Sequence, residues 1–240
     1  MSGAAIAACH RLAKLQKHSV QKQSVFGDED WCRVDKGICD EDCRSVMNAF
    51  FSEVVWVIGM VAWAIIRYPF QRRTAKIAVT RSMGGVGDKV LLLLAVAGQF
   101  LIPMFYVISG FPAVADYAFR PVQAYFGVAA ILMALVMFRL THKQLGNNWS
   151  ITLEIRQGHR FVTDGVYRYM RHPMYTSFFL LAAAQALLIQ NWIAGPVGLV
   201  SIAALVLGRI SREEKLMIDA FGDEYRAYMR RAKRIVPWLI

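Results

Sequence analysis

Long apolar runs separated by short basic segments are the feature that most constrains how this chain can fold. A membrane-spanning helix needs about 20 mostly apolar residues, because in lipid each backbone polar group must be hydrogen-bonded within the protein. Hydrophobic residues make up 56% of the 240 residues, charged residues make up 19%, and the mean hydropathy is +0.36. This composition argues against a soluble domain and predicts a multi-pass integral membrane protein.

The apolar runs predict an all-α, polytopic membrane helix bundle with about five transmembrane helices. We expect them at residues 46–66, 90–111, 121–138, 173–193 and 194–208, with the last two forming a hairpin turned near Gly195-Pro196. We therefore divide the chain into an N-terminal extramembrane segment (1–45), spans one to three (46–138) and a region that carries the chemistry (139–240).

The distribution of charge predicts the topology. The formal net charge is +11, yet residues 1–45 hold seven basic and seven acidic residues, so the whole excess lies among the spans. Lys and Arg gather in the segments after spans one, three and five, which by the positive-inside rule face the cytosol. We therefore expect the N-terminus outside, contact with anionic membrane lipids, and no nucleic-acid partner, since no soluble basic face is present.

All four cysteines precede the first span, at Cys9, Cys32, Cys39 and Cys43. On the predicted outer side a disulfide among the last three is as plausible as unpaired cysteines. Their spacing matches no common zinc pattern, so we predict no metal site.

The stretch from Ser211 to Lys233 alternates apolar and charged residues at helical spacing and predicts a cytosolic amphipathic helix. Gly222 followed by Asp223 predicts an interruption and a restart of that helix.

The segment 139–172 between spans three and four is expected to be a long cytosolic loop rich in His, Tyr, Arg and Asn, including His142. A turn at Gly158, a short extended piece and a second turn at Gly165 would allow the backbone to approach a ligand closely. Arg171-His172-Pro173 opens span four, because Pro suits the first turn of a helix, and directs N-terminal amides to an anionic group. The alternative is a basic loop that serves only topology.

Arg209 and Glu213 lie four residues apart at the end of the fifth span and share a helix face. Ionisable residues at this depth are costly unless they are used or solvated. An ordinary helix-stabilising ion pair is the competing interpretation.

Taken together, these motifs resemble the isoprenylcysteine carboxyl methyltransferase family, which is related to the phospholipid methyltransferases. The resemblance covers about residues 145–237 and rests on four ordered motifs: Gly158-His159-x-x-Val162-Thr163-x-Gly165-x-Tyr167, Arg171-His172-Pro173-x-Tyr175, Arg209-x-x-x-Glu213-Glu214, and Phe221-Gly222-x-Glu224-Tyr225-x-x-Tyr228. Two positions depart from the family pattern: Ser177 replaces a common glycine, and Thr152 replaces an expected glutamine.

The resemblance implies S-adenosylmethionine (SAM) as cofactor and methyl transfer to a lipophilic or lipidated acceptor, with the α-carboxylate of an isoprenylated cysteine as the first choice. It implies Arg209 and Glu213 as catalytic residues, with Arg209 also binding the acceptor. The implied cofactor-binding residues are His159, Arg160, Phe161, Val162, Tyr167, His172, Pro173, Met174, Tyr175 and Glu213.

Two other functions stay open at this point. A phospholipid head-group N-methyltransferase would use the same cofactor but would need a base for its amine acceptor. An NADPH-dependent membrane reductase of the sterol type resembles the C-terminal pattern, but about twice as many spans would be expected. A transporter or scaffold is disfavoured, because we find no internal repeat and only Glu53 deep in a span.

Overall fold

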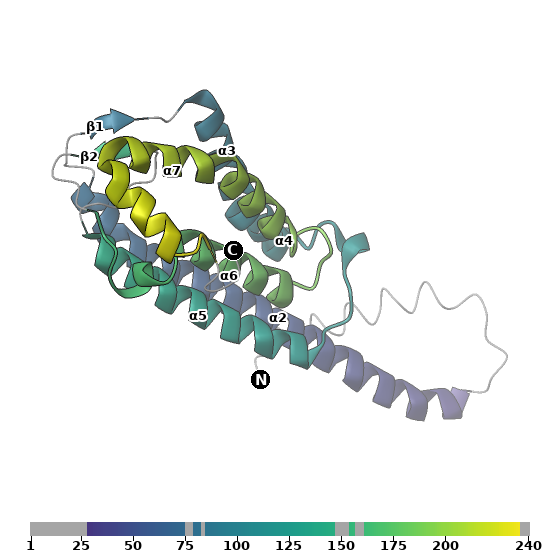
Figure 1. Cartoon of the computed structure of the whole chain (residues 1–240). Helices are drawn as coiled ribbons and strands as arrows, with labels where there is room; N and C mark the ends of the chain where they lie inside the picture. Colours follow the sequence, from purple (N-terminus) through teal and green to yellow (C-terminus); the bar gives the residue numbers. More distant parts are fainter. Residues whose placement is uncertain (1–27, 75–78, 83–84, 147–153, 157–160, 236–240) are drawn as a thin grey trace. The chain divides into compact units, whose positions relative to one another are not determined.

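The computed structural model describes residues 28–74, 79–82, 85–146, 154–156 and 161–235. Its helices are α2 (Asp28–Thr74), α3 (Val86–Val96), the π-helix η1 (Ala97–Leu101), α4 (Ile102–Ser109), α5 (Pro121–Leu145), α6 (Pro173–Leu188) and α7 (Val197–Arg231) (Figure 1). The chain divides into the units 1–51 and 52–240, and the description that follows concerns the second.

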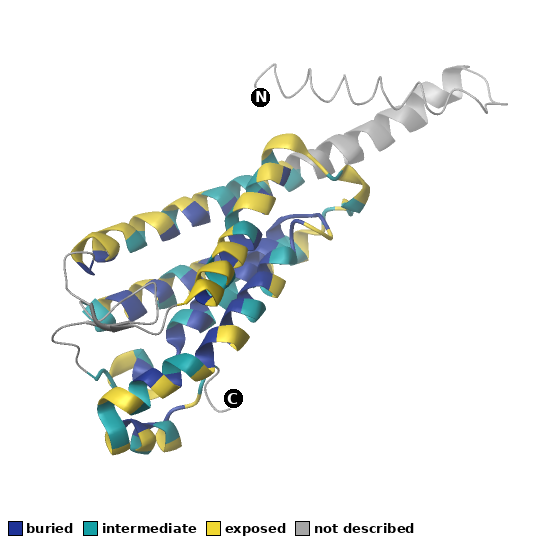
Figure 2. Cartoon of the chain, turned by 90° about the horizontal axis from the view of Figure 1, so that it is seen from above, coloured by how far each residue is buried: buried dark blue, intermediate teal, exposed yellow. Residues whose placement is uncertain are grey.

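Three helical stretches are long and apolar enough to cross a membrane: Asn48–Thr74, Val86–Ser109 and Pro121–Leu145. The second stretch is made of α3, η1 and α4 in succession. Exposed residues lie on the outer sides of these helices and buried residues on their inner sides (Figure 2), and the exposed ones include large apolar side chains such as Ile58, Phe105 and Phe126. The predicted helical membrane fold and its first three spans are therefore confirmed.

The last two predicted spans take a different form. Helix α6 is apolar but has only 16 residues, and the predicted fifth span is the first half of α7, which continues to Arg231. The amphipathic stretch is thus not a separate helix, because neither Gly nor Pro stands between Gly208 and Gly222 to stop it. Gly222 has a φ of 54° and interrupts the helix as predicted.

The start of the predicted cytosolic loop was also misplaced, since α5 continues to Leu145 instead of ending near Phe138. His142 is consequently a buried helical residue, with Nδ1 3.0 Å from the carbonyl oxygen of Phe138 and its ring 5.0 Å from that of Phe70 in α2. It helps to pack α2 against α5 and does not lie in a loop.

A short antiparallel ladder was not anticipated by the all-α prediction. Strand β1 (Val79–Ser82) pairs with β2 (Glu154–Arg156), with Val79 opposite Arg156 and Ser82 opposite Glu154. The ladder joins the segment after the first span to the segment after the third, so both basic segments lie at one end of the bundle. We call this end the loop end.

The opposite end is closed by hydrogen bonds between residues 112–117 and 190–192. The Asn191 side chain donates to the carbonyl of Pro112 at 2.9 Å and to the Asp116 carboxylate at 2.7 Å. Tyr106 also donates to Asp116, at 2.8 Å. These bonds join the α4–α5 connection to the α6–α7 connection at the end of the bundle opposite the loop end.

Helix α6 contributes to two apolar clusters. On one side Leu181, Ala184 and Leu188 pack with residues of α2 and α5 that include Trp56 and Phe138. On the other side Tyr175 and Ala182 pack with residues of α3 and α7. Because α6 is enclosed from both sides, it positions its first residues precisely relative to α7.

A buried glutamine satisfies the backbone where the second span becomes a π-helix. The widened turn of a π-helix releases carbonyl groups from the regular α-helical pattern. The side-chain amide of Gln185 in α6 lies 3.1 Å from the carbonyl oxygen of Gly98, and it also donates to the carbonyls of Ala194 and Gly195. Gln185 therefore holds η1, α6 and the α6–α7 turn together.

We expect Gln185→Leu to destabilise the protein by about 1–3 kcal/mol, because buried carbonyls would lose their donor. Thermal unfolding of the detergent-solubilised protein measures this. The control is Gln123→Leu, which removes one half-buried donor to Tyr117. Equal melting temperatures for the two variants would contradict the role of Gln185.

Candidate active site

The start of α6 is held by a segment that lies about 60 residues later in the sequence. The backbone N–H of Arg171 donates to the carbonyl of Lys233 at 2.7 Å, and that of His172 donates to the carbonyl of Arg234 at 2.9 Å. The Thr176 hydroxyl donates to the carbonyl of Ile235 at 2.6 Å. Residues 233–235 therefore form a strap along the Arg-His-Pro motif that opens α6.

Arg209 and Glu213 form the predicted pair on one face of α7, with Arg209 Nη2 3.7 Å from Glu213 Oε1. The Tyr175 hydroxyl donates to the same carboxylate at 2.7 Å. Arg209 also pairs through Nε with Oδ1 of Asp88 in α3, at 3.1 Å. The pair is therefore part of a larger group that joins α3, α6 and α7.

The neighbouring Glu214 forms a second ion-pair group. Its carboxylate accepts from Arg171 Nε at 3.0 Å and from Arg234 Nη2 at 2.7 Å. Arg171 Nη1 also donates to the carbonyls of Met229 and Ala232 at 2.9 Å. Glu214 thus joins the start of α6 to the strap.

His172 lies between the two glutamates, with Nδ1 3.4 Å from Glu213 Oε2 and Nε2 3.5 Å from Glu214 Oε1. Burial by itself would lower the pKa of His172, but the neighbouring carboxylates of Glu213 and Glu214 outweigh it and raise the pKa. Burial raises the pKa of Glu213, yet His172 and Arg209 reverse this and lower it. The site therefore favours ionised glutamates beside a protonated histidine.

An aromatic cluster formed by Phe161, Phe221, Tyr225 and Tyr228 lies beside this polar group. Phe161 stacks on Phe221 with ring centroids 5.2 Å apart and meets Tyr228 edge-on at 5.2 Å. The Tyr228 hydroxyl donates to the carbonyl of Tyr167 at 2.5 Å. These contacts connect the segment from Phe161 to Tyr167 to the second part of α7.

Six of the predicted site residues fall into two groups. His172, Tyr175, Arg209 and Glu213 lie together, whereas Phe161 and Tyr167 join the aromatic cluster. Val162 is half-buried, Pro173 is buried in the first turn of α6, and Met174 packs toward the apolar cluster of α2 and α5. His159 and Arg160, like the departure at Thr152, lie outside the described residues.

Sequence reasoning missed Asp88 and Arg234. Asp88 is the acidic residue in the first turn of α3 and is 0% exposed. Its position as a single acid among basic residues just before an apolar run was a usable signal, because an ionisable group there requires a partner. Arg234 gave no signal, since its role depends on the chain folding back.

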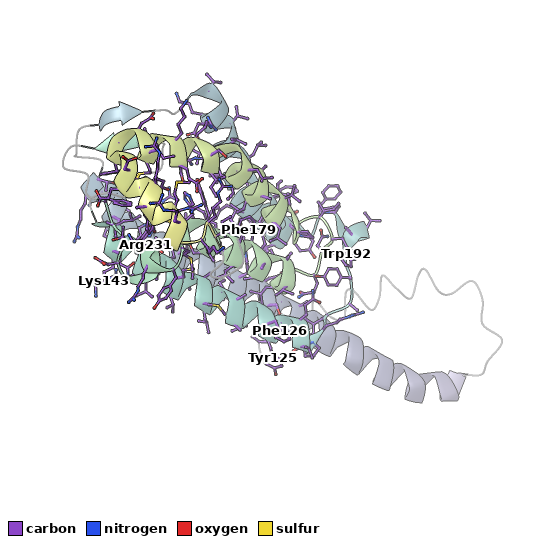
Figure 3. All side chains as sticks on the ribbon, viewed as in Figure 1. Tyr125, Phe126, Lys143, Phe179, Trp192 and Arg231 are labelled. Carbon is purple, nitrogen blue, oxygen red and sulfur yellow. The ribbon has the colours of Figure 1, made fainter. Side chains whose placement is uncertain are left out.

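Figure 3 shows Lys143 and Arg231 toward the loop end and Trp192 toward the other end. The Arg209 group lies at the loop end too, because α6 begins there and Asp88 begins α3. Fold and site together define a helical integral membrane protein with buried ion pairs gathered at one end of its bundle.

The model of the isoprenylcysteine carboxyl methyltransferase (ICMT) family matches residues 126–219. This match confirms the family resemblance that the motifs predicted. It contains the 158–175 motifs and the pair Arg209 and Glu213, but it includes neither Asp88 nor the strap.

The protein-S-isoprenylcysteine O-methyltransferase of Schizosaccharomyces pombe is 30% identical over 96 residues, which are 39% of this chain and 41% of that protein. Methanethiol S-methyltransferase 1 of Bradyrhizobium diazoefficiens is 34% identical over 80 residues, covering 33% of this chain and 27% of that protein. The structure of the eukaryotic intramembrane Ras methyltransferase ICMT matches 63% of this chain and 52% of its own, with 21% identity and a TM-score of 0.44. The chain thus spans less than half the length of the first of these relatives.

The Glu214 group predicts an acid-dependent loss of stability. Burial by itself would raise the pKa of Glu214, but the contact with His172, the hydrogen bond from Arg234 and the charge of Arg171 lower it from 4.5 to about 2. A carboxyl whose pKa is lowered by folding stabilises the protein above its unfolded pKa and loses this contribution as the pH falls toward the folded value.

We therefore expect Glu214→Gln to lower stability by about 3 kcal/mol or more at neutral pH, because Arg171 would remain buried without its carboxylate. The difference from wild type should shrink between about pH 4.5 and 2. Thermal unfolding across this range measures it. Glu224→Gln removes the same charge from an exposed position of α7 and should have little effect; a constant wild-type difference at every pH would contradict the assignment.

Proposed function

We propose that this chain is an integral membrane SAM-dependent methyltransferase whose acceptor is the α-carboxylate of an isoprenylated cysteine or a similar lipid-linked carboxylate. The observation that carries the proposal is the pair formed by the buried Arg209 and the half-buried Glu213, which meets His172 and Tyr175 of the family motif at one end of an apolar bundle. The family match over residues 126–219 and the names of the relatives support the same chemistry.

The residues of the site fit the charged end of SAM. The Glu213 side chain is 27% exposed, whereas those of Arg209 and Glu214 are 5% exposed, so Glu213 is the carboxylate open to a ligand. We assign it to the ammonium group of the cofactor. The N-terminal amides of α6 suit the carboxylate of the cofactor, because a helix N-terminus favours an anion.

When bound, SAM supplies an electrophilic methyl group on a sulfonium, and the reaction is an in-line displacement. The protein then has to position the reactants and complement the changing charge. Arg209 keeps the acceptor carboxylate ionised and oriented, because a guanidinium stays charged and offers a fork of donors. Glu213 orients Arg209 and the cofactor, and Tyr175 fixes Glu213 through its hydroxyl. Tyr167 and Phe161 contribute the apolar side of the cofactor site.

The topology follows from the same proposal. The loop end would face the cytosol, where SAM enters from water, and the acceptor would enter from the lipid between the spans. The N-terminus would then lie outside, and the catalytic region would comprise residues 139–240. A possible disulfide among Cys32, Cys39 and Cys43 concerns side chains outside the described residues.

An amine head group is the second candidate acceptor, because the site gathers three carboxylates, from Asp88, Glu213 and Glu214. A panel of acceptors separates the candidates: N-acetyl-S-farnesyl-L-cysteine, phosphatidylethanolamine and methanethiol, each with radiolabelled SAM. We expect methylation of the first. Methylation of phosphatidylethanolamine alone would establish the amine function, and methanethiol alone would establish a thiol acceptor.

Cofactor class is tested by titrating the purified protein with S-adenosylhomocysteine and with NADPH. We expect binding of S-adenosylhomocysteine at micromolar concentration and no binding of NADPH. The reverse result would favour the sterol-type reductase and overturn the proposal.

We expect Arg209→Ala to lower kcat/KM for N-acetyl-S-farnesyl-L-cysteine by about 10²–10³, because the donor that holds the acceptor carboxylate is lost. The affinity for S-adenosylhomocysteine should change little. Arg226→Ala, on an exposed position where Arg226 pairs only with Asp223 among the described residues, is the matched control and should keep wild-type rates. Full methyl transfer by Arg209→Ala would remove Arg209 from the mechanism.

A further inference from the structure

Asp88 is a buried carboxylate that neither the family match nor the sequence motifs include. It lies in the first turn of α3, where its backbone N–H donates to the carbonyl of Gly85 at 3.1 Å. Its side chain is 0% exposed. A charge buried this completely at the end of a membrane helix is expensive unless a partner compensates it.

The partner of Asp88 is Arg209, 121 positions later in the chain. Asp88 Oδ1 lies 3.1 Å from Arg209 Nε and 3.9 Å from Arg212 Nη2. Arg212 is 38% exposed at its side chain, whereas Arg209 is 5% exposed. The close and fully buried contact is therefore the one with Arg209.

Two carboxylates hold the guanidinium of Arg209 from different elements. Asp88 in α3 contacts Nε, and Glu213 in α7 contacts Nη2 at 3.7 Å. Both contacts are ion pairs and not hydrogen bonds, and together they restrain the position of the guanidinium from two elements. Glu213, one turn away on the same helix, restrains it from α7 alone.

The backbone around Asp88 is well placed for this task, because α3 and α7 approach closely. A Cβ atom on Gly208, the residue before Arg209, would collide with the Leu91 side chain in α3. Farther along, Gly98 packs against Ser201 in the same way. Helices in such close contact leave the Asp88 carboxylate little room to move relative to Arg209.

We propose that Asp88 is a positioning residue, which fixes the guanidinium of Arg209 in the orientation that receives the acceptor carboxylate. This inference rests on the proposed function, in which Arg209 binds that carboxylate. Asp88 does not touch either reactant; it acts through Arg209. Any lipid-linked carboxylate acceptor would need the same positioning of Arg209.

The test compares binding of N-acetyl-S-farnesyl-L-cysteine with binding of its neutral carboxamide, both to the full chain in lipid nanodiscs. The ratio of the two affinities reports recognition of the carboxylate. We expect wild type to prefer the carboxylate. Asp88→Ala should lower its affinity for the carboxylate ligand by about 10–10², since a misplaced contact in a site costs up to this much, and leave the carboxamide unchanged.

Asp88→Asn keeps the shape of the side chain but removes the charge that pairs with Arg209. Because Asp88 and Arg209 form an ion pair without a hydrogen bond, this variant should lose as much affinity for the carboxylate ligand as Asp88→Ala does. Wild-type affinity in Asp88→Asn would mean that the charge of Asp88 does not position Arg209 and would overturn the proposal. Wild-type carboxylate affinity in Asp88→Ala would overturn it as well.

Two further measurements separate positioning from a merely structural role. S-adenosylhomocysteine affinity should be retained in Asp88→Ala, and its loss in step with the acceptor would show a general structural defect and overturn the proposal. Asp116→Ala removes a hydrogen-bonded carboxylate at the other end of the bundle and should leave the ligand preference unchanged. If wild type itself does not prefer the carboxylate, the proposed acceptor is wrong, and the role of Asp88 fails with it.

Discussion

The ion pair between Arg171 and Glu214 is the interaction on which the arrangement of the site depends. It joins Arg171, two residues before the first residue of α6, to the middle of α7, and Arg234 extends it to the strap. The exposed fractions of the Arg171 and Glu214 side chains are 8% and 5%, so each is a buried charge that the other compensates. Because the pair fixes the start of α6 against α7, it also fixes where His172 and Tyr175 meet Glu213.

Two adjacent glutamates on α7 therefore have different tasks. Glu214 turns toward Arg171 and Arg234 and holds the scaffold together, while Glu213 turns toward Arg209, His172 and Tyr175 and belongs to the site. Consecutive residues on a helix are separated by about 100° around its axis, so they necessarily face different neighbours. His172 contacts both carboxylates and couples the scaffold to the site.

The sequence predicted the first three spans well, because hydropathy acts over short distances, and it predicted that Arg209 and Glu213 share one face of a helix. It could not predict that α7 would continue past Gly208. The first part of α7 is apolar and the second part is amphipathic, so a single helix shows two hydrophobic patterns that are typical of two separate elements. The sequence also placed His142 in a loop, because Arg139 ends the uncharged apolar run after Phe138, although α5 continues to Leu145. His159 and Arg160 lie outside the described residues, so their predicted contacts are untested.

The contacts that the sequence could not predict are those between distant segments. Asp88 and Arg209 are brought together by the packing of α3 on α7, and Arg171 and Arg234 by the folding back of the chain after α7. The hydrophobic periodicity within one helix or strand carries no information about such pairs. Motif reasoning found Arg209 and Glu213, which are neighbours on one helix, but it missed Asp88, which contacts Arg209 from α3.

The strap has a consequence for how the protein is made. The N–H groups of Arg171 and His172 bond to carbonyls of Lys233 and Arg234, which leave the ribosome only after α6 and α7 have been synthesised. Until then the Arg-His-Pro segment lacks the partners that fix it, although the spans before it can already be in the membrane. Assembly of the polar end is thus a late event in biogenesis, and a chain released early would insert as a membrane protein without completing its site.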